Sequence, residues 1–291
     1  MHAFDYAAPQ TVDAAVALLS EHGDQARLLA GGSDIIAQLK EGRRQLKVLV
    51  DIKKIPEANE LSYDSANGLV LGAGVSCCRI YEDDEISAAY PALVDSASLI
   101  GAIQIQGRAT IGGNLCNASP AADSIPTLIA LGAVAHIVGP GGGREVAAES
   151  FCTRPGQSVL ESNEFLISLH IPAPKANSGA MFLRLIPRNE MDIAVTNAAA
   201  AVVIDQSGDY FESARIAVGA VAPIPLFLPE AGDALAGNEV SDEVIERAAS
   251  IARESSRPIT DMRGTVEQRT HLAGVLTRRA IQGAVERAKA S

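Results

Sequence analysis

One stretch of the sequence decides how the rest is interpreted: TIGGNLCNASPAAD, which runs from Thr110 to Asp123. Its two adjacent glycines allow a backbone to approach a ligand closely, because glycine has no Cβ in the way. Its Thr and Asn side chains supply hydrogen-bond donors and acceptors. Asp123 leads a helix expected at 125–131, where its carboxylate could cap the helix or accept from a ribose hydroxyl. Taken alone, the stretch is also compatible with a generic loop.

A second glycine pair lies earlier in the chain, in LLAGGSDI (Leu28–Ile35). The pattern predicts a strand at 26–30, a tight turn at 31–34 and a helix at 35–40. Backbone N–H groups at such a turn attract a phosphate, and Ser33 adds a hydroxyl donor. The stretch is neither G-x-G-x-x-G nor a P-loop, and an ordinary strand-to-helix turn is its simpler interpretation. Two such stretches without a catalytic dyad beside them fit a dinucleotide held mainly by backbone amides.

The composition narrows the class of protein. A chain of 291 residues suggests two domains at roughly 150 residues each. The hydrophobic fraction of 47% is enough for packed cores, which excludes disorder of the whole chain. The 24 basic and 35 acidic residues give a net charge of −11, which argues against binding to nucleic acid.

The cysteines, the histidines and the N-terminal residues show no pattern typical of a disulfide framework, a metal site or a signal peptide. The four cysteines form no C-x-x-C, so a disulfide framework, a zinc site or an iron–sulfur site held by this chain is not expected. The five histidines are scattered, without a pair at metal-ligand spacing. No transmembrane span and no signal peptide are expected, and we predict a cytoplasmic protein.

Local patterns predict an alternation of helix and strand. Strands are expected at 47–52 and 164–172, a hairpin turn with positive φ at both Asn67 and Gly68, a surface turn at 139–144, and a linker at 172–179. Beyond the linker, the strands expected at 198–205 and 214–221 suggest a small antiparallel sheet. Helices are expected at 242–255 and from Thr265 to about Lys289, the second opened by a capping box between Thr265 and Gln268.

Together, the two glycine stretches resemble the FAD-binding subunit of molybdenum hydroxylases. That family includes the medium subunits of carbon monoxide dehydrogenase and of bacterial enzymes similar to xanthine dehydrogenase. Three further segments agree with the family in order and spacing, at 164–172, 182–194 and 261–280. The resemblance covers essentially the whole chain, and its most specific part is Thr110–Asp123.

The resemblance implies an α+β fold. Residues 1–174 would form an FAD-binding domain of the vanillyl-alcohol-oxidase/PCMH type, with subdomains at about 1–55 and 56–174 that clasp an extended FAD. Residues 179–291 would form a small C-terminal domain with a three-stranded antiparallel sheet and helices.

The resemblance also implies which residues hold FAD. The pyrophosphate would be wrapped by the backbone of Leu28, Leu29, Ala30, Gly31, Gly32, Ser33, Asp34 and Ile35. The cradle would continue through Thr110, Gly112, Gly113, Asn114 and Asn117. Asp123 would hold a ribose hydroxyl, Leu166 would lie near the flavin or adenine, and Arg184 would lie near the flavin ring.

One position departs from part of the family. Some members carry a Tyr that covers the isoalloxazine where this chain has Ile193. The aliphatic side chain puts identity as a carbon monoxide dehydrogenase in doubt and leaves the gating of the flavin face open.

The function implied is electron transfer within a complex. Its partners would be an iron–sulfur small subunit and a molybdenum-cofactor large subunit, and its external acceptor would be NAD, a quinone or oxygen. Such a subunit needs an apolar or mixed surface near the flavin, expected on the C-terminal domain and its last helix. The alternatives are a self-sufficient FAD-dependent oxidase and a module that binds another phosphate ligand.

Overall fold

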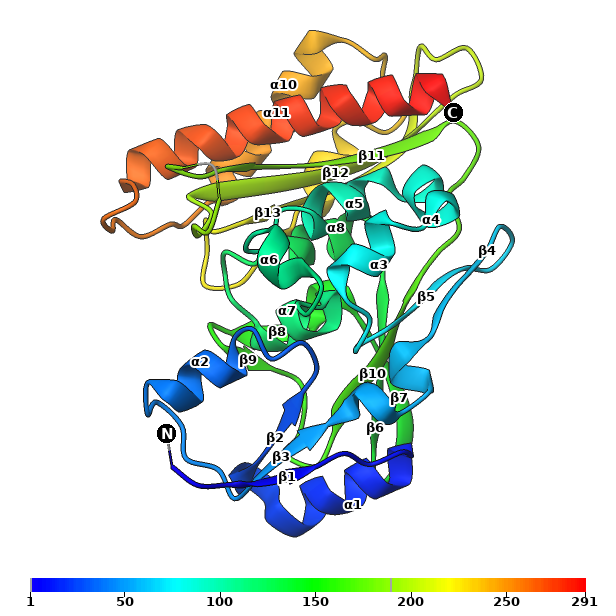
Figure 1. Ribbon diagram of the computed structural model, residues 1–291. Helices are drawn as coiled ribbons and strands as arrows, with labels where there is room; N and C mark the ends of the chain where they lie inside the picture. Colours follow the sequence, from blue (N-terminus) through cyan, green and yellow to red (C-terminus); the bar gives the residue numbers. More distant parts are fainter. Residues whose placement is uncertain (1, 189) are drawn as a thin grey trace.

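The computed structural model describes residues 2–188 and 190–291. Helices and strands are mixed throughout, and three larger sheets organise the chain (Figure 1). Two of these sheets come from the first 171 residues, and the third begins at Ser178. The two parts are joined through the segment at 172–177, where the sequence predicts a linker.

The first sheet is parallel and lies near the N-terminus. Its strands are β1 (Asp5–Ala7), β2 (Ala26–Leu29) and β3 (Val48–Asp51), in the order β1-β3-β2. Helix α1 (Val12–His22) joins β1 to β2, and helix α2 (Ile35–Lys40) joins β2 to β3. All four residues of the central strand β3 are buried, which explains its apolar run Val48–Val50, and the strand ends in the buried Asp51.

The second sheet is antiparallel and has five strands in the order β4-β5-β10-β6-β7. Its strands are β4 (Leu61–Asp64), β5 (Gly68–Gly72), β6 (Val134–Gly139), β7 (Gly142–Ala147) and β10 (Phe165–Ile171). A separate two-stranded sheet contains β8 (Cys152–Arg154) and β9 (Gln157–Ser158). The strand predicted at 164–172 is therefore confirmed, as the central strand of this sheet.

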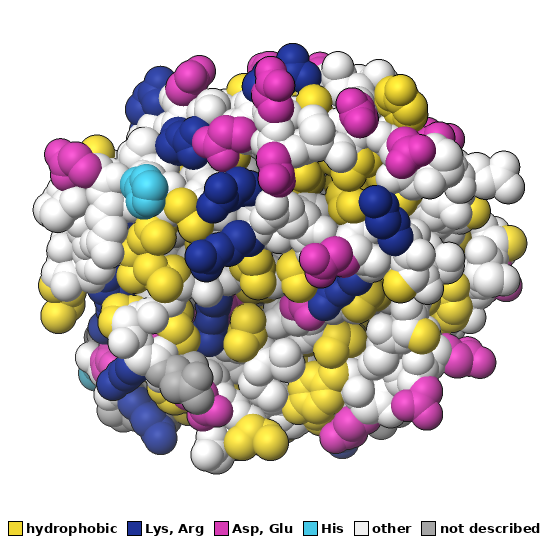
Figure 2. Space-filling model, turned by 90° about the horizontal axis from the view of Figure 1, so that it is seen from above, with side chains coloured by type: hydrophobic (Ala, Val, Ile, Leu, Met, Phe, Trp, Pro, Cys, Tyr) yellow, Lys and Arg dark blue, Asp and Glu magenta, His cyan; other side chains and the backbone are white. Residues whose placement is uncertain are grey.

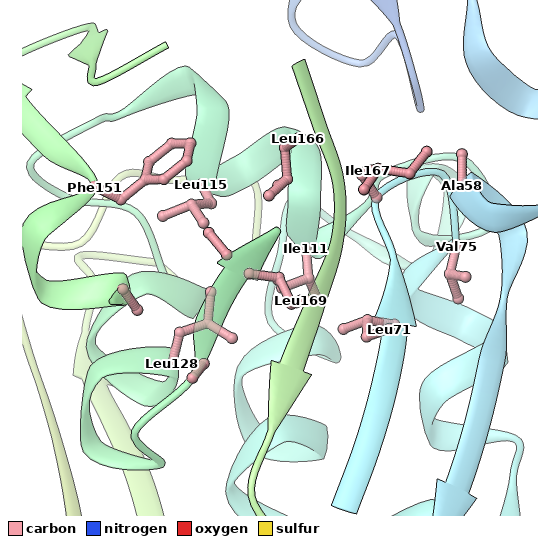
Figure 3. Close-up of a cluster of buried hydrophobic side chains, with 14 of the residues drawn as sticks. Ala58, Leu71, Val75, Ile111, Leu115, Leu128, Phe151, Leu166, Ile167 and Leu169 are labelled. Atoms are coloured by element: carbon pink, nitrogen blue, oxygen red, sulfur yellow. The ribbon is translucent and has the colours of Figure 1, made fainter. Parts of the chain in front are cut away.

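Six short helices lie between this sheet and the C-terminal sheet (Figure 1). They are α3 (Cys77–Tyr81), α4 (Asp84–Ala89), α5 (Pro91–Ala97), α6 (Ile103–Gln106), α7 (Ile111–Asn117) and α8 (Ser124–Ala130). Short 3₁₀ helices are η1 (Gly23–Gln25), η2 (Ile52–Lys54), η3 (Glu57–Asn59) and η4 (Ala148–Ser150). Figure 3 shows Ile111 and Leu115 of α7 beside Leu166 and Leu169 of β10 in the core that fixes α7 to the sheet.

The C-terminal sheet is antiparallel, with the order β11-β12-β13-β14. Its elements are β11 (Ser178–Leu185), β12 (Thr196–Ile204), β13 (Phe211–Gly219), β14 (Leu226–Phe227), α9 (Pro229–Asp233), α10 (Asp242–Ser255) and α11 (Val266–Ala290). The expectation of three strands is wrong by one, because the two-residue β14 pairs with β13. The two predicted strands and both predicted helices are present, and Thr265 caps α11 by accepting from the Gln268 N–H.

Small residues bring the layers of this domain close together. Three alanines of β12, Ala198, Ala199 and Ala200, are buried, and the strand packs against both α11 and α8. A Cβ on Gly179 of β11 would lie 2.1 Å from the backbone oxygen of Ala284 in α11. The apolar stripe of α11 therefore belongs to the core. On the face seen from above, basic and acidic side chains are interspersed, with apolar side chains exposed between them (Figure 2).

Two turns differ from the prediction. The β4–β5 hairpin has a three-residue loop, because Asp64 pairs with Gly68, and of the predicted Asn-Gly pair only Gly68 has a positive φ, at +100°. The Asp64 carboxylate accepts the N–H groups of Ala66 and Asn67, which stabilises this longer loop. The surface turn predicted at 139–144 contains fewer residues in the structure, because β7 already begins at Gly142.

Within the two described ranges, every helix is too short or too polar to cross a membrane.

Candidate functional site

Both glycine stretches open onto one cleft of about 570 Å³. The cleft lies between the β2–α2 loop and α7, and β9 and β10 complete its wall. The residues from the sequence prediction that line it are Leu28, Ala30, Gly31, Gly32, Ser33, Asp34, Ile35, Thr110, Gly112, Gly113, Asn114, Asn117 and Leu166. The three predicted residues outside the lining are Leu29, Asp123 and Arg184.

The first wall depends on glycine at two adjacent positions. A Cβ on Gly31 would lie 2.1 Å from the backbone oxygen of Arg108, so this turn packs directly against another backbone. Gly32 has φ +81°, a left-handed conformation that side chains other than glycine rarely adopt. Leu29 points away from the cleft into a small core with Leu39 and Leu49. Backbone contact, rather than a side chain, therefore shapes this wall.

The second wall is a helix and not the loop that the sequence suggested. Thr110 is the N-cap of α7, and its Oγ1 accepts the Gly113 N–H at 2.8 Å. A Cβ on Gly112 would lie 2.6 Å from the Cα of Ala73, so α7 packs against the segment after β5. The helix ends at Ala118, which has φ +47°. The Thr N-cap was the available signal for this helix, and the high content of Gly and Asn obscured it.

Asn114 connects α7 to α8. Its Oδ1 accepts the Ser124 hydroxyl at 2.6 Å and the Ser124 N–H at 3.3 Å. Asn114 therefore caps α8, and the alternative in which Asp123 caps that helix is wrong, since the Asp123 side chain makes no capping hydrogen bond.

Asp123 instead forms a buried ion pair with Arg184 of β11. The Arg184 Nη1 donates to Asp123 Oδ2 at 2.6 Å, and the two side chains are only 4% and 13% exposed. Burial raises the pKa of Asp123 to about 6, and Arg184 acts in the opposite direction. Asp123 Oδ1 and Arg184 Nε are buried without a hydrogen-bond partner among the described residues. Buried polar atoms of this kind normally bond to a ligand group or an ordered water.

Ile193 lies on the segment between β11 and β12, which is close to this ion pair in sequence. Its side chain is 51% exposed. The neighbouring Asp192 forms an ion pair with Arg263 at 3.5 Å, and the Met191 N–H donates to the Gly101 oxygen at 3.2 Å. The ion pair joins this segment to the stretch before α11, and the hydrogen bond joins it to Gly101; Met191 has φ +53°.

Sequence reasoning missed the charged groups of the cleft. Arg27 of β2 and Arg44 after α2 both line it, as do Gln38, Glu161 and Glu164. No motif marks these residues, because segments far apart in the sequence, at 24–44 and 156–166, meet at the cleft.

The cleft and the ion pair fit an extended FAD. Gly31 and Gly112 let the β2–α2 loop and α7 pack directly against neighbouring backbone, and this packing brings the two glycine stretches together along one cleft. The unpartnered oxygen of Asp123 suits a hydroxyl or ring N–H donor. In the described part of the chain, no three His, Cys, Asp or Glu side chains are grouped to hold a metal ion.

Two protein-family models match the chain. The one described as FAD binding domain in molybdopterin dehydrogenase matches residues 2–174, and the one described as CO dehydrogenase flavoprotein C-terminal domain matches residues 181–284. Among curated relatives, the carbon monoxide dehydrogenase medium chain of Afipia carboxidovorans is 35% identical over 98% of both chains. The xanthine dehydrogenase FAD-binding subunit of Escherichia coli O157:H7 is 31% identical over 97% of both chains.

Solved structures agree with these relatives. A chain of carbon monoxide dehydrogenase from Hydrogenophaga pseudoflava superposes with a TM-score of 0.93 and 32% identity, over 98% of both chains. A chain of quinoline 2-oxidoreductase from Pseudomonas putida 86 superposes with a TM-score of 0.90 and 29% identity, over 99% of this chain and 98% of that one. The family-model matches and the near full-length similarity above 30% identity show that the chain belongs to the FAD-binding oxidoreductase subunits of the molybdenum hydroxylase family.

Proposed function

We propose that this chain is the electron-transfer subunit of a molybdenum hydroxylase complex, with FAD extended from the cleft to the Asp123–Arg184 ion pair. The cleft carries the proposal, because residues of both glycine stretches line it together. Bound FAD would accept electrons from the iron–sulfur clusters of a partner subunit and pass them to an external acceptor, NAD, a quinone or oxygen.

Each part of the site has its own role in this proposal. The backbone from Leu28 to Ile35 lies along the pyrophosphate, and α7 continues that wall. The Asp123 Oδ1 accepts a hydrogen bond from a ribose hydroxyl, and Arg184 keeps the carboxylate oriented toward it. Leu166, buried on β10, packs against an apolar part of the cofactor. Ile193 leaves the approach to the ring less covered than a Tyr would.

The described residues that line the cleft include no histidine, and its carboxylates lie among arginines and amides. The chain would therefore position the cofactor, desolvate it and supply charge to it. A partner subunit would oxidise the substrate. This division of tasks favours the electron-transfer subunit over a self-sufficient oxidase.

A titration of the flavin-free chain with FAD tests the cofactor part of the proposal. We expect saturable binding with one FAD per chain and the visible absorption of oxidised flavin in the purified protein. A colourless chain that does not bind FAD, or that prefers another nucleotide, would refute it. Turnover of a substrate by the isolated chain would instead support the oxidase.

The exposed surface of the chain also supports the proposal that it binds partner subunits. Exposed apolar side chains lie on the segment between β11 and β12 and on the segment before α11, with Ile193 51%, Ile259 70% and Met262 93% exposed. Arg269 holds these segments together, because it donates to the Val195 and Ala220 oxygens and to the Asp261 carboxylate. Exposed apolar groups near a redox centre suit the iron–sulfur subunit, whose cluster must come close to the flavin.

Co-purification from cells that express the whole complex tests this assembly. We expect the chain to be recovered with an iron–sulfur and a molybdenum subunit, and Met262→Asp to reduce that recovery without loss of FAD. Recovery of the wild-type chain alone, loaded with flavin, would contradict the complex.

A further inference from the structure

Two arginines line the cleft without a carboxylate partner. The Arg27 Nη1 donates to the backbone oxygens of Asp24 at 3.1 Å and Ala26 at 2.7 Å. The Arg44 Nε donates to the Gln38 amide oxygen at 2.5 Å. Within the described ranges, the hydrogen bonds of both guanidinium groups therefore go to neutral oxygens. The other N–H groups of each remain available to a ligand.

The two positive charges act on each other. Partial burial lowers the pKa of Arg27, and the nearby charge of Arg44 lowers it further, with Asp24 acting in the opposite direction. Holding two like charges together costs free energy unless an anion lies between them.

Arg44 is held in place from α2. Gln38 donates from its amide nitrogen to the Asp34 carboxylate and accepts from Arg44 through its amide oxygen. Asp34 therefore orients Gln38, and Gln38 orients Arg44. This contact explains why Asp34 lies at the cleft although a carboxylate would repel a phosphate.

The remaining charges of the cleft are acidic. They belong to Asp24, Asp34, Glu161 and Glu164, and Glu164 is paired with Arg144 at 2.8 and 2.7 Å. Among the described lining residues, Arg27 and Arg44 supply the positive charge. Without these two arginines, the residues that line the cleft would have a net negative charge, which would repel a pyrophosphate.

We propose that Arg27 and Arg44 together neutralise the pyrophosphate of FAD, and so make the cleft select a charged dinucleotide over an uncharged flavin. This inference rests on the proposed function and adds side-chain charge to a site that the sequence predicts to work through backbone amides.

Binding of FAD to the full chain tests this inference through four variants. They are Arg27→Gln, Arg44→Gln, the double variant, and Arg43→Gln as the control. Arg43 neighbours Arg44 and carries the same charge, but it pairs with Glu41 and does not line the cleft. Arg44 is exposed, so its replacement leaves the fold intact.

We expect each cleft variant to raise the Kd for FAD about tenfold, since a hydrogen bond to a charged group contributes about 1.5 kcal/mol or more and 1.4 kcal/mol is tenfold. The double variant should lose most of the salt dependence of FAD binding, because salt screens the charges that it removes. Binding of riboflavin, which lacks phosphate, and binding of FAD to Arg43→Gln should be unchanged.

The failures are distinguishable. If the wild-type chain does not bind FAD, the proposed function itself is wrong. If the wild-type and Arg43→Gln chains bind FAD while Arg44→Gln and the double variant bind it equally well with the same salt dependence, only the role of the arginines is overturned. Equal losses for FAD and riboflavin would also overturn it, because they would indicate a structural role.

Discussion

At the residue scale, the absence of single side chains shapes the cleft. Gly31 faces the Arg108 carbonyl so closely that a methyl group has no space. We expect Gly31→Ala to displace the turn, to destabilise the fold by about 1–3 kcal/mol and to abolish tight FAD binding, since overpacking costs free energy of this order.

Gly107→Ala is the matched control for this change. Gly107 has open space around it and an ordinary negative φ of −67°, and it does not line the cleft. The measurements are FAD titration and chemical unfolding. Equal behaviour of the two variants would show that the turn tolerates a side chain.

The Asp123–Arg184 pair gives the site a dependence on pH. Burial raises the pKa of Asp123 from 3.8 to about 6, so the folded state binds this proton more tightly than the unfolded state. Its contribution to stability is therefore fully present below pH 3.8 and is lost as the pH rises through about 6. One pKa unit corresponds to about 1.4 kcal/mol, so the contribution is at most about 3 kcal/mol.

The variant Asp123→Asn isolates the contribution of Asp123 to the pH dependence of stability. Other carboxylates, such as Asp51 and Glu164, have lowered pKa values and act in the opposite direction, so the wild-type curve mixes several groups. We expect the stability of Asp123→Asn relative to wild type to increase between pH 4 and 6, measured by urea unfolding of the flavin-free chain. A difference that stays constant over this range would contradict the raised pKa.

At the element scale, α7 shows what local patterns can and cannot predict. The glycines and asparagines of Thr110–Asp123 have low helix propensity, and the sequence therefore suggested a loop. Packing of Ile111 and Leu115 into the core reverses that preference. The longer elements α10, α11 and β10 were predictable, because their periodic apolar residues and caps agree with their tertiary environment.

The N-cap of α7 is tested by Thr110→Ala, with Thr11→Ala as its control. Thr11 caps α1 in the same way, with its Oγ1 accepting the Ala14 N–H at 3.3 Å, but it lies outside the cleft. Loss of either cap should cost about 1 kcal/mol. Only Thr110→Ala should weaken FAD binding, and Thr110→Ser should restore it. If both alanine variants bind FAD like the wild type, the cap does not support the site.

At the scale of the whole molecule, the sequence predicted two domains and their order but not how they touch. The ion pair of Asp123 and Arg184 joins residues 61 apart, and that of Asp95 and Arg287 joins residues 192 apart. No local pattern carries such pairings, because they depend on the packing of α5 and α8 against the C-terminal sheet. The family resemblance supplied an expected role for Arg184, but neither its partner nor the contact made by Asp95.

The contact between α5 and α11 gives the last prediction. Arg287 donates to both carboxylate oxygens of Asp95, at 2.6 and 2.9 Å, and Asp95 also accepts the Phe182 N–H at 3.2 Å. We expect Asp95→Asn to lower the free energy of unfolding by about 1–3 kcal/mol, because hydrogen bonds to charged groups in a partly buried site are lost. Glu41→Gln breaks the exposed pair with Arg43 by the same chemical change and should cost less than about 1 kcal/mol. If the two variants unfold at the same denaturant concentration, the Asp95–Arg287 ion pair does not help to hold the domains together. If Asp95→Asn unfolds in two steps, this ion pair couples them into one cooperative unit.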